Sequence, residues 1–265
     1  MRYRRLGRTE LVVSDVGLTA RALEGLAPEV AGATLQAAIA AGVSLIAMDA
    51  RDSSSDLEPL IASVVGIERP RLTIVGVLDH LPPAADLAPE VAAIAARFGT
   101  SGYLDVVAFP QAPTPEHLAA LADLRDRRLV RFTGLATSDT EAAIAAVEGG
   151  NVDVLVAPLN QPGRDRMRTA VQAASDADLG VVLAGRVTSG GTLRDERLAA
   201  ALMQVSRGHG VSAAHALVAW GLTETGVTSV AAGATSPAEA ADLAEASATA
   251  PLPGRWIEAL RGAHA

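Results

Sequence analysis

The chain has 265 residues, of which 49% are hydrophobic and 20% are charged, and its formal net charge is −8. This length can bury a large core in one domain, and an acidic chain without a basic stripe argues against nucleic-acid binding. The sequence contains no cysteine, which excludes disulfides and thiolate metal sites, and it contains no lysine, so all 22 lysine-or-arginine positions are arginine. Neither a secretory signal nor an apolar run long enough to span a membrane is present, so we expect a cytoplasmic protein.

The chain opens on a predicted β-hairpin at residues 4–13 and then alternates short β-branched runs with Ala- and Leu-rich stretches, the pattern of repeated strand–helix units. Eight barrel strands are expected, at residues 15–19, 43–48, 72–78, 105–109, 130–135, 154–157, 181–184 and 227–232. Helix-start signals lie between them at Pro28, Thr114, Asp139 and Ser212. This alternation predicts one α/β domain over residues 1–265, a single (β/α)8 TIM barrel with an N-terminal β-hairpin.

Three stretches carry a resemblance to a known family. They are YRRLGRTELVVS at 3–14, AGVSLIAMD at 41–49 and YLDVV at 103–107. These stretches resemble the aldo/keto reductases, and the similarity extends over nearly the whole chain, to GATSP at 233–237. The resemblance implies an aldo/keto-reductase-like barrel whose site lies at the carboxyl ends of the strands.

The resemblance also implies which residues stand at the family's four catalytic positions. Asp49 matches the family's aspartate, whereas Ser54, Val77 and Pro110 stand where the family has its tyrosine, lysine and histidine. In the family the tyrosine protonates the carbonyl oxygen while nicotinamide delivers hydride, and the lysine lowers the pKa of that tyrosine. Three of the four groups therefore differ.

The positions that hold the nicotinamide cofactor in the family differ as well. The resemblance places Ala136 and Thr137 at the amide-binding pair and Leu159 at the stacking aromatic. It places Glu239 in the helix where the family surrounds the 2′-phosphate with basic and amide groups, and a carboxylate there repels a phosphate. From these differences we expect no cofactor, and NADPH least of all.

Asp49 and His80 are the predicted catalytic residues. Asp49 is expected to act as a general acid or base, or to anchor an arginine-lined anion pocket. The plain alternative is that it caps a loop or closes a salt bridge. His80 follows the third strand and is suited to proton transfer near neutral pH, with an exposed loop histidine before Pro82 and Pro83 as its alternative.

A second set of residues is expected to bind a substrate at the barrel mouth: Arg21, Arg51, Ser54, Phe109, Gln111, Asn160 and Arg186. No His, Asp or Glu residues have the spacing of a metal site, so no metal is expected. His117 and His215, each in the first turn of a helix, are expected in the outer layer without a role.

The leading functional hypothesis from the sequence is an enzyme that has lost NAD(P)H-dependent carbonyl reduction. Such an enzyme would catalyse a non-redox proton transfer (cyclisation, dehydration or isomerisation) on a small organic metabolite in the barrel mouth. The first alternative is a non-catalytic barrel that binds a ligand or partner. The second is an atypical NAD(P)H-dependent oxidoreductase. The expected partner is a small molecule, with no nucleic acid or membrane, and no oligomeric state is predicted.

Overall fold

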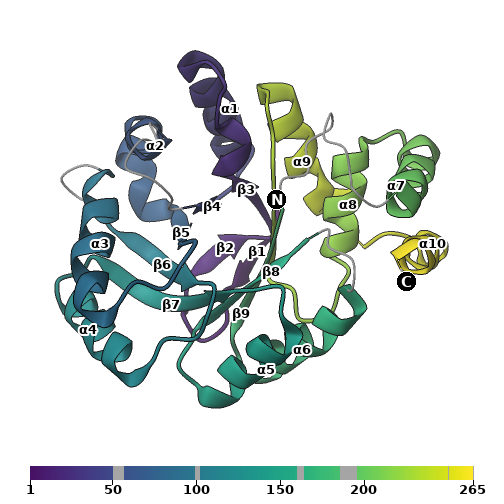
Figure 1. The fold of residues 1–265 in the computed structure, drawn as a ribbon. Helices are drawn as coiled ribbons and strands as arrows, with labels where there is room; N and C mark the ends of the chain where they lie inside the picture. Colours follow the sequence, from purple (N-terminus) through teal and green to yellow (C-terminus); the bar gives the residue numbers. More distant parts are fainter. Residues whose placement is uncertain (50–56, 99–101, 160–163, 186–195, 250, 265) are drawn as a thin grey trace.

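The computed structural model describes residues 1–49, 57–98, 102–159, 164–185, 196–249 and 251–264. Within these ranges, eight parallel strands form a closed barrel in the order β10-β3-β4-β5-β6-β7-β8-β9 (Figure 1). Their bounds are β3 Val16–Thr19, β4 Leu45–Asp49, β5 Thr73–Val77, β6 Leu104–Phe109, β7 Val130–Ala136, β8 Val154–Pro158, β9 Gly180–Gly185 and β10 Ser229–Ala232. The predicted (β/α)8 barrel is confirmed, and each strand end lies within two residues of the expected position.

Helices surround the barrel on its outer side (Figure 1). Their bounds are α1 Pro28–Ala40, α2 Leu57–Val65, α3 Ala84–Ala96, α4 Pro115–Asp126, α5 Thr140–Gly149, α6 Arg164–Asp176, α7 Glu196–His209, α8 Ala213–Gly221, α9 Pro237–Thr249 and α10 Gly254–His264, with 3-10 turns η1 Ala20–Leu23 and η2 Gly66–Arg71.

Two predicted helix starts have cap hydrogen bonds. The Asp139 carboxylate accepts from the backbone N–H groups of Glu141 and Ala142, and the Ser212 hydroxyl accepts from the N–H of His215. Each cap satisfies a donor that the first turn of the helix leaves open.

The predicted N-terminal hairpin is present, with β1 Tyr3–Arg5 antiparallel to β2 Val12–Ser14. Its side chains Leu6, Leu11 and Val13 are buried among the interior side chains of the barrel, so the hairpin closes the amino-terminal end of the barrel. Gly7, at φ +53, makes a bridge to Leu179. A Cβ at Gly7 would lie 2.2 Å from the backbone nitrogen of Gly180, so the close approach requires glycine.

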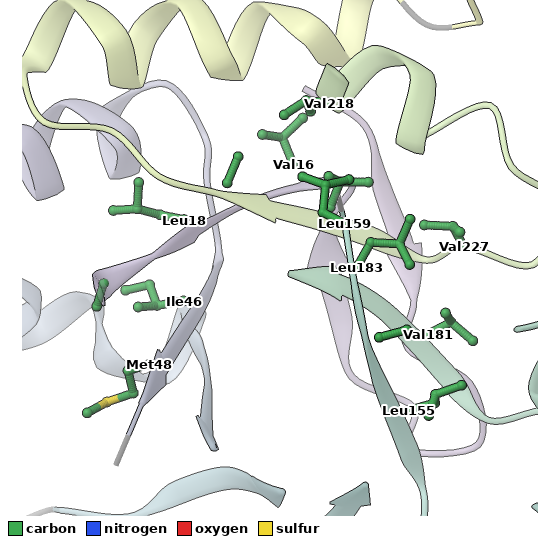
Figure 2. Packing of buried hydrophobic residues seen from close by; sticks show 14 of the residues in the cluster. Val16, Leu18, Ile46, Met48, Leu155, Leu159, Val181, Leu183, Val218 and Val227 are labelled. Carbon is green, nitrogen blue, oxygen red and sulfur yellow. The ribbon is translucent and has the colours of Figure 1, made fainter. Parts of the chain in front are cut away.

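The core has two layers. The larger one lies between the strands and the helices, and Figure 2 shows part of it, including Val16, Ile46, Leu155 and Leu183. The smaller one fills the barrel interior with aliphatic side chains of the strands, such as Val75, Val106 and Val182, and with the buried side chains of the hairpin. Because the interior is filled, ligands can reach the barrel only at its two ends.

Candidate functional site

The carboxyl ends of β4, β5 and β6 lie side by side at the barrel mouth. Asp49, the last residue of β4, is in register with Val77 on β5, and Val77 is in register with Ala108 on β6. Pro110 follows directly after β6. The strand pairing therefore brings Asp49, Val77 and Pro110, three of the four positions implied by the family resemblance, to one edge of the mouth. Only the backbone of Asp49 belongs to the described part of the chain.

The floor of the mouth is apolar. Val77, Ala136 and Ala184 stand near the ends of β5, β7 and β9 and pack against the interior cluster while remaining half-buried. Small apolar side chains on alternate strands make a low surface at the mouth. Such a surface suits a flat, weakly polar group.

His80 lies on the loop after β5, where its side chain is 58% exposed. Its Nδ1 is 2.8 Å from Oδ1 of Asp79, and its Nε2 is 3.6 Å from Oε2 of Glu90 on α3. The hydrogen bond with Asp79 raises the pKa of His80 most strongly; burial lowers it, and the charges of Glu90 and Asp79 raise it further. The imidazole thus lies between two carboxylates and is largely exposed to solvent. Its catalytic role stays a prediction.

Three further predicted residues have described positions. Arg21 lies in η1, directly after β3, and is half-buried. Gln111 is exposed just after β6. Phe109 is fully buried in the layer between the strands and the helices. The expectation that Phe109 reaches the mouth does not fit this position, because its side chain has no open face toward the barrel end.

Four predicted residues lie outside the described residues: Arg51, Ser54, Asn160 and Arg186. Their roles stay predictions from the sequence. In the described part of the chain, no group of three or more His, Asp or Glu side chains is placed to hold a metal ion. Among the described helices, none is both long enough and apolar enough to cross a membrane.

Glu239 closes the amino-terminal end of α9, next to the last barrel strand. Its Oε2 accepts hydrogen bonds from the backbone N–H of Thr235, at 2.8 Å, and from the Thr235 hydroxyl, at 2.9 Å. The Glu239 N–H donates to the Ser236 hydroxyl at 3.3 Å, so Ser236 caps the first turn of α9 while the Glu239 carboxylate reaches back to Thr235. A half-buried carboxylate therefore occupies a helix end that otherwise favours phosphate.

The whole fold matches solved structures from end to end. An aldo-keto reductase from Bacillus halodurans, AKR11C1 in its holo form, aligns over 100% of this chain and 97% of its own, with a TM-score of 0.82 and 16% identity. A thermostable aldo-keto reductase, Tm1743 in complex with the inhibitor epalrestat, aligns over 99% and 100%, with a TM-score of 0.81 and 20% identity. This chain has the aldo-keto reductase fold. By sequence, no family model and no curated protein matches it.

These comparisons correct two expectations from the sequence. The non-redox proton-transfer hypothesis is wrong as a leading interpretation, because the two solved structures described above are aldo-keto reductases. The expectation of no cofactor is wrong too, because the Bacillus halodurans protein is described in its holo form. Both expectations rested on individual side chains at aligned positions, whereas the likeness extends over the full chain.

The sequence missed one buried polar network. His215, 2% exposed, places Nδ1 3.2 Å from Oδ1 of Asp242 and Nε2 2.8 Å from the hydroxyl of Thr249, and Ser212 donates to the same aspartate. The network joins α8 to α9. His215 does lie in the outer helical layer, as expected, but its partners are 27 and 34 residues away in the chain. No short-range pattern could have revealed them.

Proposed function

We propose that this chain is an atypical NAD(P)H-dependent oxidoreductase that reduces a small carbonyl compound in the cytoplasm. The observation that carries the proposal is the end-to-end match to a holo aldo-keto reductase, at a TM-score of 0.82 over 100% of the chain. It is supported by an open barrel end where strand pairing sets Asp49 beside an apolar floor.

The floor of the mouth fits a nicotinamide ring. Val77, Ala136 and Ala184 offer apolar surface without bulky side chains, and such surface keeps water from a reacting centre. When bound, the reduced nicotinamide supplies a hydride to the carbonyl carbon of the substrate. The protein's own residues then have to orient that carbonyl and supply a proton to its oxygen.

Glu239 fits the adenosine end of NADH better than that of NADPH. The family resemblance puts this helix end at the cofactor's 2′ position, and the Glu239 carboxylate there already accepts two hydrogen bonds from Thr235. A carboxylate accepts a hydrogen bond from a ribose hydroxyl but repels a 2′-phosphate. The proposal therefore favours NADH as the hydride source.

The proton donor must differ from that of the family. The sequence has two tyrosines. Tyr3 lies in β1 and donates to the carbonyl of Gly42, and Tyr103 immediately precedes β6, so both belong to the amino-terminal end of the barrel. We assign the proton transfer to Asp49 at the mouth. The exposed His80, on the neighbouring loop, is the group that exchanges protons with solvent.

The test is to follow the oxidation of NADH and of NADPH in the presence of a panel of small aldehydes and ketones. Turnover with at least one carbonyl compound, faster with NADH, is expected. Asp49→Asn should lower kcat by about a hundredfold or more, as loss of a general acid does. Asp123→Asn, which changes an exposed acid on the outside of α4, should leave kcat unchanged. Equal turnover by Asp49→Asn would remove Asp49 from the mechanism, and no oxidation of either nucleotide would overturn the reductase.

A further inference from the structure

A groove opens at the amino-terminal end of the barrel, on the side away from the mouth. It has a volume of about 560 Å³ and lies where α4 ends and β6 and β7 begin. Its lining consists of Tyr103, Arg125, Arg128, Val130, Arg131 and Phe132. Three of these six side chains are arginines, in a chain whose net charge is −8.

One buried carboxylate serves two arginines beside the groove. Asp105, 1% exposed, has Oδ2 at 3.0 Å from Arg69 and Oδ1 at 2.9 Å from Arg131. The guanidinium of Arg69 also stacks on the Tyr103 ring, with its central carbon 3.7 Å from the ring centroid. Arg131 is 48% exposed, so part of its guanidinium remains open to the groove.

A second carboxylate is shared in the same way. Asp153 is 3.2 Å from Nε of Arg8 and 3.6 Å from Nη2 of Arg125. Arg125 also donates to the Thr133 hydroxyl at 2.7 Å, which holds its guanidinium at the edge of β7. Each acid therefore balances only half of the positive charge that it holds in place.

Arg128 adds a guanidinium that has no hydrogen bond or ion pair among the described residues. It is exposed and lies just past the C-cap of α4, at φ +59, in the left-handed region that glycine usually occupies at this position. The Cβ of any residue other than glycine, here of Arg128, strains the backbone in this conformation. Arg128 therefore lines the groove with an exposed charge that no described acid balances.

We propose that this groove binds a small organic phosphate. Four arginines around it (Arg8, Arg69, Arg125 and Arg131) share two carboxylates and Arg128 has none, so a surplus of positive charge faces the groove. Guanidinium groups bind phosphate through paired hydrogen bonds. The groove is larger than a phosphate ion needs and lies within the size range of small-molecule sites. Tyr103, Val130 and Phe132 offer an apolar wall to the organic part.

Phenyl phosphate is the probe, because it joins a dianion to a planar apolar body. We expect calorimetric titration of the full chain to give saturable binding, weakened at higher salt. Arg128→Gly should weaken that binding about tenfold or more, the equivalent of one charge-assisted hydrogen-bonded contact. The same variant relaxes the backbone at φ +59, so its melting temperature should stay the same or rise. Weaker binding therefore cannot be ascribed to a damaged fold.

Arg127→Gln is the matched control. Arg127 is the neighbouring residue, pairs with Asp123 at 3.2 Å and does not line the groove, so its loss removes the same charge without the contact. Its affinity for phenyl phosphate should stay within about twofold of the parent chain. Parent-like binding by Arg128→Gly, or no binding of phenyl phosphate at all, would overturn the site. If benzoate binds as tightly as phenyl phosphate, the site does not select phosphate over carboxylate. If inorganic phosphate binds as tightly, the organic part of the ligand contributes nothing. Either result would contradict the proposal. None of these results depends on the reductase proposal.

Discussion

The two ends of the barrel differ in the residues that lie beside an aspartate near a strand end. At the amino-terminal end, Asp105 is held by Arg69, Arg131 and the backbone N–H of Ile74. At the carboxyl-terminal end, Asp49 is in register with Val77. The amino-terminal end surrounds a buried acid with fixed cations, whereas the described side chains at the carboxyl-terminal end form an apolar floor of Val77, Ala136 and Ala184.

This difference separates a structural use of charge from a chemical one. Two arginines and a backbone N–H around one buried acid fix the packing of its neighbours. At the mouth, the proposed function assigns a proton transfer to Asp49. Arginine is the cation that pairs with Asp105 at the closed end, whereas Val77 stands where the family resemblance implies a lysine.

The largest expected effect is at the closed end. Asp105→Asn leaves the charge of the buried Arg69 without its acid, and breaking a buried pair on one side costs about 3–5 kcal/mol. Denaturant unfolding should show a loss of that order in the free energy of unfolding. Asp123→Asn breaks an exposed i,i+4 pair with Arg127 and should cost less than about 0.5 kcal/mol. Similar losses in the two variants would mean that Asp105 is not held as described.

A smaller effect is expected at the start of α9. Glu239→Gln removes a negative charge from a helix amino terminus and should cost about 0.5–1 kcal/mol of unfolding free energy. The same change should reduce any preference for NADH over NADPH. Glu245 lies near the carboxyl end of the same helix and provides the control. Glu245→Gln removes a negative charge there, which should be neutral or slightly stabilising. A stability loss with an unchanged nucleotide preference would confine Glu239 to its capping role.

The smallest effect concerns His80. Its pKa in the folded chain is raised above the ordinary value for histidine, so its contribution to stability is complete below the unfolded pKa and is lost as the pH rises through the folded pKa. Because the side chain is largely exposed, that contribution should be about 0.3 kcal/mol. An NMR titration should show the raised pKa, and Asp79→Asn should return it toward the ordinary value. An unchanged pKa in that variant would exclude Asp79 as the cause.

The sequence predicted the barrel closely because its period and its cap residues are local signals. Pro28, Asp139 and Ser212 stand at helix starts, as expected. Side-chain surroundings were harder to predict, because they depend on residues distant in the chain. Phe109 faces the helices and not the mouth, and Arg128 meets Tyr103 and Phe132 only after α4 has folded onto β7. The cofactor expectation failed for the same reason, since single aligned positions do not report how a whole groove binds.

The most direct test of the account is the melting temperature of the chain with NADH and with NADPH. A ligand that binds only the folded state at about a hundred times its Kd adds about 2.7 kcal/mol of stability. NADH should therefore raise the melting temperature by several degrees, and NADPH should raise it less because of Glu239. No shift with either nucleotide at millimolar concentration would contradict the proposed oxidoreductase.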